Sequence, residues 1–177
     1  MKEADQQSLI LDLKQRLPFS TGADRIQIAE AITASGIELD SLFGLLLTDK
    51  RTALRFLWLI SDIGIKEKQY LHKALPALWV YIRQHCPEHL LSFASYWHIA
   101  GVPEELESEA IPKLFEWIAS SEVNVTMKSR SIFVLQHLVS KYPDLQQEFH
   151  TLLELQADRY SADFERRVRK IIVESSR

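Results

Sequence analysis

The segments "ALPALWVYI" (residues 74–82) and "AIPKLFEWI" (residues 110–118) repeat one pattern 36 positions apart. In each, alanine and a branched apolar residue precede a proline, and leucine, two aromatic residues and isoleucine follow at helical spacing. A proline inside a helix costs about 3 kcal/mol, so Pro76 and Pro112 at matching positions indicate a shared structural need. The alternative is that each proline only starts a helix after a short loop. Either interpretation predicts a repeated helical unit.

Other features recur at a similar distance along the chain. Apolar residues lie at helical spacing throughout, whereas β-type alternation is hard to find. We expect about ten helices joined by short connections. A period near 40 residues is typical of arrays in which each helical pair buries its apolar face against the next pair. The recurring features are three phenylalanines 37 and 40 residues apart (Phe56, Phe93, Phe133), two glycines 37 apart expected just beyond helix ends (Gly64, Gly101) and two prolines 40 apart expected at helix starts (Pro103, Pro143).

Local signals predict where individual helices begin and end. Asp24 is expected to cap a helix that ends at Gly36, which suits the left-handed C-terminal position. Thr48 or Asp49 is expected to cap the helix over residues 50–63. The acidic residues of "VPEELESE" (102–109) are expected to favour the positive end of a helix dipole and to stay solvated.

Two further segments carry a family resemblance. "TDKRTALRFLWLISDI" (48–63) and "SEVNVTMKSRSIFVLQHLV" (121–139) resemble the turn and second helix of a HEAT or armadillo repeat. The resemblance covers about residues 38–175, and residues 1–37 are expected to be a divergent first helix pair or a cap. It implies a single all-α domain over 1–177, a right-handed α-α superhelix of about five antiparallel helix pairs. In such repeats a proline often bends the first helix of a pair.

A closer resemblance is to small bacterial HEAT-like proteins of unassigned function. The chain shares with them a tryptophan-bearing helix at residues 52–63, the segment "VPEELESE" at 102–109 and the segment "SKYPDLQ" at 140–146. This resemblance implies no established activity, because none is known for the family.

Composition sets broad limits on function. Apolar residues make up 46% and charged residues 25% of the 177 residues, which is an average globular balance. The net charge of -3 gives no global attraction to nucleic acid. Cys86 is the only cysteine, and no segment has the pattern of a signal peptide or membrane span. We therefore expect a cytoplasmic protein.

The sequence contains no pattern typical of an enzyme. It has no glycine-rich phosphate loop, no G-x-S-x-G elbow and no H-E-x-x-H motif. His85, Cys86 and His89 are candidate soft-metal ligands, but Pro87 interrupts them and no fourth ligand is near. A helix end with exposed histidines and a buried cysteine is favoured. We expect no catalytic residue, no metal and no cofactor.

The best candidate surface lies on the helix over residues 50–63. Arg51, Arg55, Trp58 and Asp62 fall at i, i+4, i+7 and i+11, which places them in one stripe. Tryptophan and arginine are enriched at interface hot spots, and the HEAT resemblance implies that second helices line a concave binding face. Lys128 and Arg130 are expected to extend the stripe on another second helix. In the alternative, Trp58 is a core residue and the arginines snorkel over it. The remaining tryptophans (Trp79, Trp97, Trp117) are expected to pack between helices.

A second charged feature lies near the C-terminus. Arg166, Arg167, Arg169 and Lys170 form a basic segment, with Arg159 nearby. It predicts nucleic-acid binding through phosphate neutralisation, or simply cations placed favourably at a helix C-terminus. HEAT-like DNA alkylation-repair proteins are a distant comparison, but their strongly basic groove is absent here.

The sequence thus favours a non-enzymatic scaffold or adaptor that binds a protein or peptide on a concave face, as a monomer or an end-to-end homodimer. The alternative is a DNA-binding protein that uses the C-terminal basic helix.

Overall fold

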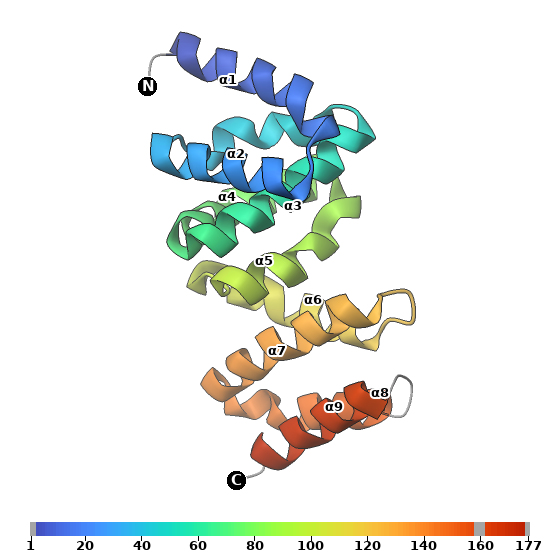
Figure 1. The fold of residues 1–177 in the computed structure, drawn as a ribbon. Helices are drawn as coiled ribbons and strands as arrows, with labels where there is room; N and C mark the ends of the chain where they lie inside the picture. Colours follow the sequence, from blue (N-terminus) through green and yellow to red (C-terminus); the bar gives the residue numbers. More distant parts are fainter. Residues whose placement is uncertain (1–2, 158–161, 176–177) are drawn as a thin grey trace. The chain divides into compact units, whose positions relative to one another are not determined.

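The computed structural model describes residues 3–157 and 162–175, and every regular element within these ranges is a helix. The all-α prediction is therefore confirmed for this part of the chain. The chain divides into two compact units, Met1–Pro103 and Glu104–Arg177 (Figure 1). Each unit has a core of its own.

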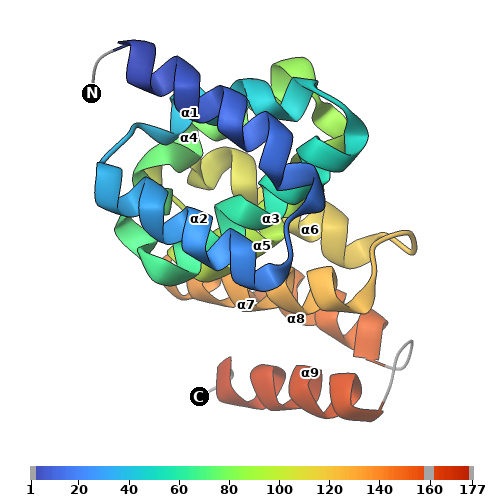
Figure 2. The same ribbon diagram turned by 45° about the horizontal axis from the view of Figure 1, so that its top comes forward.

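The first unit is built around one long helix, α3. The unit's elements are α1 (Glu3–Arg16), η1 (Leu17–Phe19), α2 (Gly22–Ser35), η2 (Leu39–Leu47), α3 (Lys50–Lys66), α4 (Lys68–His85), η3 (Pro87–Ser92) and α5 (Phe93–Ala100), in which η marks a 3-10 helix. The short helix η1 turns the chain back from α1 into α2 (Figure 2). The neighbours α2, η2, α4 and α5 all pack against α3.

Capping side chains set the start of α2 and α3. Thr21, not Asp24, is the N-cap of α2, and Asp24 completes a capping box by accepting a hydrogen bond from the Thr21 backbone N–H at 2.8 Å. Gly36 ends α2 with φ of 65°, the predicted left-handed conformation. Asp49 caps α3 by accepting from the backbone N–H of Arg51 at 3.0 Å and of Thr52 at 3.1 Å.

Gly64 lies inside α3, whereas the sequence predicted that the helix ends before it. A Cβ atom at this position would lie 2.3 Å from Leu71 Cδ2, 3.3 Å from Leu71 Cβ and 3.1 Å from Ile99 Cγ2. Glycine here therefore permits a close approach of α3 to α4 and α5. It does not terminate the helix.

The two repeated prolines both lie within helices. Pro76 is inside α4, and Pro112 is inside α6 of the second unit (Glu107–Ala119). The alternative in which each proline merely starts a helix is therefore wrong. The superhelical HEAT-like arrangement of the pairs stays a prediction.

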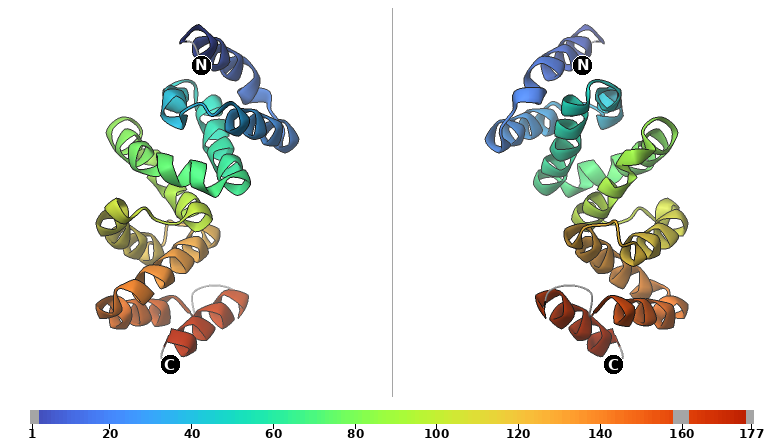
Figure 3. Two further views of the ribbon diagram at one scale, coloured as in Figure 1. Left: turned by 90° about the vertical axis from the view of Figure 1, so that its left-hand side faces the viewer. Right: turned by 90° about the vertical axis from the view of Figure 1, so that its right-hand side faces the viewer.

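The second unit consists of two helical hairpins. Its elements are η4 (Glu104–Leu106), α6, α7 (Val125–Lys141), η5 (Pro143–Leu145), α8 (Gln146–Ala157) and α9 (Ala162–Ser175). The helix α6 packs against α7, α8 packs against α9, and α8 also contacts α6 (Figure 3).

The helices α3 and α7 correspond residue by residue. Each has 17 residues, and each begins after an acidic or amide N-cap, Asp49 or Asn124. Each buried residue of α7 lies 75 positions after a buried residue of α3. The buried residues of α7 are Lys128, Ser131, Ile132, Val134, Leu135, Leu138 and Val139. Their counterparts in α3, in the same order, are Ala53, Phe56, Leu57, Leu59, Ile60, Ile63 and Gly64. The two units thus contain the same kind of helix with the same buried face.

This correspondence corrects one expected equivalence. Phe133 was expected to match Phe56, which is fully buried, but Phe133 is 45% exposed. At the offset of 75 residues it corresponds to Trp58, which is also exposed. The period inferred from the phenylalanines was therefore two residues too long over this interval.

Candidate functional site

Six residues of the first unit form a mixed aromatic and charged surface. They come from η1, α2 and α3, and we call them the aromatic–arginine surface: Phe19, Arg25, Arg51, Arg55, Trp58 and Asp62. Four of these residues form the stripe on α3 that the sequence predicted.

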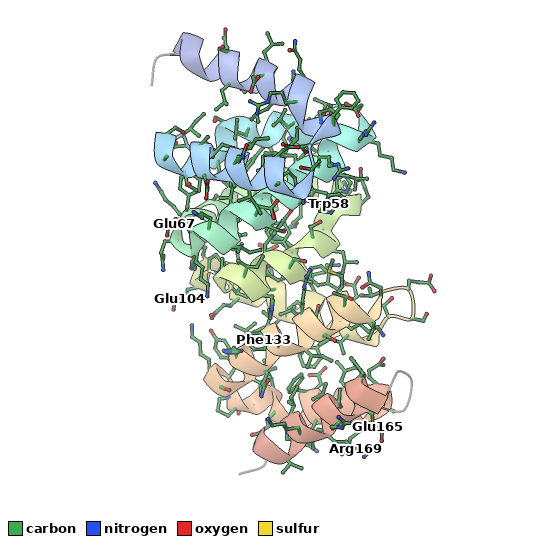
Figure 4. The ribbon with its side chains drawn as sticks, viewed as in Figure 1. Trp58, Glu67, Glu104, Phe133, Glu165 and Arg169 are labelled. Atoms are coloured by element: carbon green, nitrogen blue, oxygen red, sulfur yellow. The ribbon has the colours of Figure 1, made fainter. Side chains whose placement is uncertain are left out.

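Trp58 is the centre of this surface. Its side chain is 50% exposed, whereas Trp79, Trp97 and Trp117 are buried as predicted. The alternative in which Trp58 belongs to the core is therefore wrong. Figure 4 marks its position on α3. The Arg55 guanidinium lies 4.8 Å and the Arg25 guanidinium 5.2 Å from the indole ring centroid. Each cation–π contact stabilises the arrangement by about 0.5–1 kcal/mol at an exposed site. The two arginines therefore keep the exposed indole ring in one position.

Arg25 also ties α2 to α3. Its Nε donates a hydrogen bond to Asp62 Oδ2 at 2.9 Å, and only 14% of the Arg25 side chain and 19% of the Asp62 side chain are exposed. An ion pair this well shielded from water is screened less than a surface pair. Asp62 therefore orients Arg25, and Arg25 in turn lies against Trp58.

Phe19 and Arg51 form the other end of the surface. Phe19 is the last residue of η1 and is 72% exposed, and the Arg51 guanidinium lies 4.9 Å from its ring centroid. The exposed ring is therefore held beside a cation.

The rigidity of this surface comes from α3. The opposite face of the helix carries Phe56, Leu59, Ile60 and Ile63, all fully buried. The hydrogen bond from the Thr52 hydroxyl to Asp49, together with those from the backbone, lowers the pKa of Asp49 and fixes the first turn. Arg51, Arg55 and Trp58 are thus mounted on a helix whose start and buried face are both fixed.

The charge of this surface is only partly compensated. Asp62 pairs with Arg25, whereas the guanidinium groups of Arg51 and Arg55 lie against rings and form no ion pair within the described ranges. Leu54, also on α3, is 38% exposed one turn before Trp58. The surface therefore offers two uncompensated cations beside apolar area.

Sequence reasoning missed Phe19 and Arg25. Phe19 follows Pro18 in a connection, and Arg25 is one of several basic residues near a helix start. Neither belongs to the periodic stripe of α3. Only the packing of η1 and α2 against α3 brings them to Arg51 and Trp58.

Lys128 does not extend an exposed stripe, contrary to expectation. It is 0% exposed, and its Nζ donates to Gln156 Oε1 of α8 at 3.1 Å. The cause is its place on the buried face of α7, where it corresponds to Ala53 of α3. Arg130 is half-buried on the solvent side of α7, at the position that corresponds to Arg55.

The solvent-facing side of α7 carries an aromatic pair. The rings of Phe133 and His137 lie 4.5 Å apart, and His137 Nδ1 is 2.8 Å from the backbone oxygen of Phe133. Arg130 and Phe133 thus repeat the spacing of Arg55 and Trp58 in the second unit.

The C-terminal basic segment lies in the body of α9, not at its end. The last turn of α9 carries no basic residue, so the expected helix-dipole explanation does not apply. Arg166, Arg169 and Lys170 are exposed, and Arg169 Nε pairs with Glu165 Oε1 at 2.8 Å (Figure 4). Arg159 and the side chain of Arg167 lie outside the described residues.

The candidate metal ligands do not form a site. Cys86 is buried, and burial raises the pKa of its thiol. His85 is exposed, and its ring lies against that of Tyr81 in a tilted arrangement with 4.7 Å between the ring centroids. Within residues 3–157 and 162–175, no three His, Cys, Asp or Glu side chains lie close enough together to hold a metal ion.

Glu107 differs from the solvated residue that the sequence predicted. It is buried at the start of α6 and accepts hydrogen bonds from Lys141 Nζ at 2.8 Å and from the Tyr142 hydroxyl at 2.6 Å. Burial raises the pKa of Glu107, but these hydrogen bonds outweigh it, so the pKa lies below its usual value. The cluster joins the start of α6 to the end of α7 and has a structural role.

The second unit also has an open groove of about 720 Å³. It is lined by apolar residues (Phe115, Ala119, Leu152, Leu155) and by three carboxylates (Glu116, Asp144, Glu148), among others. Because its charged lining residues are acidic, this groove does not share the arginine-rich chemistry of the first unit.

None of the helices in the described ranges combines the length and the apolar character needed to cross a membrane. Comparison with family models, with curated proteins and with solved structures finds no match. The function must therefore be argued from the chemistry of the residues themselves.

Proposed function

We propose that the protein is a non-enzymatic, HEAT-like helical scaffold that binds a protein or peptide through the aromatic–arginine surface. One observation carries the proposal: Trp58 is half-exposed on a rigid helix, with two arginine side chains against its ring. Tryptophan and arginine dominate binding energy at protein interfaces, and a ring that is already ordered loses little entropy on binding. The HEAT-like arrangement of the helix pairs and the cytoplasmic location expected from the sequence belong to this proposal.

The test compares wild type with Arg55→Glu/Trp58→Ala in affinity capture from host lysate, with and without nuclease. Both changes are at solvent-side positions of α3, so the variant is expected to keep its helical circular dichroism and its cooperative unfolding, although the loss of two cation–π contacts costs about 1–2 kcal/mol. Lys73→Glu on α4, an exposed residue outside this surface, is the charge-matched control. A nuclease-resistant protein that is bound by wild type and Lys73→Glu but lost from the double variant supports the proposal. Retention of every captured protein by the folded double variant contradicts it.

Nucleic-acid binding by α9 is the second candidate, and its basis is the exposure of Arg166, Arg169 and Lys170. Glu165 compensates Arg169 in part. The candidate predicts oligonucleotide binding that weakens steeply between about 50 and 200 mM salt and again in Arg166→Gln/Lys170→Gln. If the protein binds oligonucleotides negligibly at every salt concentration, nucleic-acid binding by α9 is excluded.

A further inference from the structure

We infer that the aromatic–arginine surface takes an acidic peptide segment in which two Asp or Glu residues stand two positions apart and an apolar residue follows or precedes them. This inference rests on the proposed function and names its partner class.

The first argument is the state of the two cations. The guanidinium Cζ atoms of Arg51 and Arg55 lie over the rings of Phe19 and Trp58, at 4.9 and 4.8 Å from the ring centroids. A guanidinium has five N–H donors, and a contact between its charge and a ring leaves these donors available to a ligand. A carboxylate fits two of those donors at once. Within the described ranges, neither arginine forms an ion pair with a carboxylate, so both offer a charge and donors to an acidic ligand.

The second argument is spacing. Arg51 and Arg55 are four residues apart on α3, which is about 6 Å along a helix axis. Alternate residues of an extended chain face the same side and are about 6.6 Å apart. An extended segment with acidic residues at positions i and i+2 therefore matches the two arginines in register. Trp58, three residues beyond Arg55, then meets the side chain at i+4.

The third argument is the apolar component. Trp58 is half-exposed, and Leu54, which lies between Arg51 and Arg55 on α3, is exposed as well. Covering such area contributes about 25 cal/mol per Å², which a purely acidic ligand cannot use. The ligand is expected to carry Leu, Ile, Met or an aromatic residue at the position over Trp58.

The charge balance favours a peptide over a nucleic acid. Single-stranded nucleic acids follow long positive grooves that neutralise many phosphates, whereas this surface offers two uncompensated arginines. Asp49 lies at the Arg51 end of the surface, where it accepts hydrogen bonds from the backbone N–H groups of Arg51 and Thr52. Asp62 lies at the other end, and Arg25 balances its charge. A long polyphosphate backbone therefore finds only two uncompensated cations here, which are enough for a short acidic segment.

The test is selection of a displayed library of random 12-residue peptides on the purified full chain, with subtraction on folded Arg55→Glu/Trp58→Ala. We expect most enriched peptides to carry acidic residues at i and i+2 with an apolar residue two positions away. For a synthetic copy of an enriched peptide, replacing both acids by their amides is expected to weaken binding at least tenfold. Arg55→Glu is expected to do the same, and Lys73→Glu to change it less than twofold.

Charge exchange makes the test specific. In Arg55→Glu, a peptide with lysine in place of one acid is expected to regain at least part of the lost affinity. Three results would each overturn the inference. The enriched peptides could lack acidic residues, or none of them could depend on Arg55 for binding. Alternatively, a 20-nucleotide single strand could displace a bound peptide at a lower concentration than the same peptide added in free form. If the lysate partner depends on Trp58 but the selected peptides lack acids, this inference fails while the proposed function stands.

Discussion

Arg55 and Trp58 stand three residues apart on α3, and Arg130 and Phe133 repeat this pair at the corresponding positions of α7. The two helices share their length and their pattern of buried positions, so the repeated pair faces solvent in both. The two pairs therefore occupy equivalent solvent-side positions of the two helices.

Trp58 is expected to dominate collisional quenching of tryptophan fluorescence by iodide, because the other three tryptophans are buried. The anion is also expected to quench better than caesium, since Arg25 and Arg55 lie beside the ring. Stern–Volmer titrations of wild type and Trp58→Phe check this, and iodide quenching should nearly vanish in the variant. Trp117→Phe is the control and should keep it. Quenching that survives Trp58→Phe contradicts the exposure of this residue.

Arg25→Gln is expected to lower the free energy of unfolding by about 1–2 kcal/mol, between the values typical of exposed and of buried ion pairs. The same change removes one cation from the ring of Trp58 and should raise its quenching by acrylamide. Urea unfolding and quenching measure the two effects. The matched control is Arg16→Gln, which breaks the exposed pair with Asp12 and should cost under about 0.5 kcal/mol. Equal losses in the two variants would mean that the Arg25–Asp62 pair is no better shielded than a surface pair.

Gly64→Ala is expected to destabilise the first unit by about 1–3 kcal/mol through overpacking. The added methyl group would meet Leu71 of α4, which is fully buried, and Ile99 of α5, which is half-buried. A gain in helix propensity of up to about 1 kcal/mol offsets part of the loss. Gly44→Ala provides the comparison, because a Cβ atom there has no neighbour within 4 Å. Thermal and urea unfolding measure the stability of both variants. A Gly64→Ala variant that is more stable than wild type would contradict the close packing at this position.

Glu107 is expected to make stability depend on pH in the acid range. Its folded-state pKa lies below the ordinary value of 4.5, so its stabilisation is complete above about pH 4.5 and is lost as pH falls through the lowered pKa. Wild type should therefore exceed Glu107→Gln in unfolding free energy at pH 7, and the difference should shrink below pH 4. Urea titrations at several pH values measure this. Glu105→Gln, at an exposed position of η4, should show little difference from wild type at any pH.

Much of the fold was predictable because it depends on local spacing. The helices over residues 50–63 and 125–140, the cap at Asp49 and the left-handed Gly36 all follow from short-range signals. The stripe of Arg51, Arg55, Trp58 and Asp62 follows from the helical repeat alone. Helix boundaries were less predictable, as Gly64 shows, because glycine both ends helices and permits close packing.

The sequence by itself determined that this is an all-α chain with repeated helices and which residues share a face of α3. Tertiary structure decided whether each face is covered: it left Trp58 and Phe133 exposed, buried Lys128 against Gln156, and brought Phe19 and Arg25 to the stripe. The physical reason is that periodicity fixes the direction of a side chain relative to its own helix. Burial depends on a second helix, which here comes from residues about 30 or more positions away, and no local pattern specifies that neighbour.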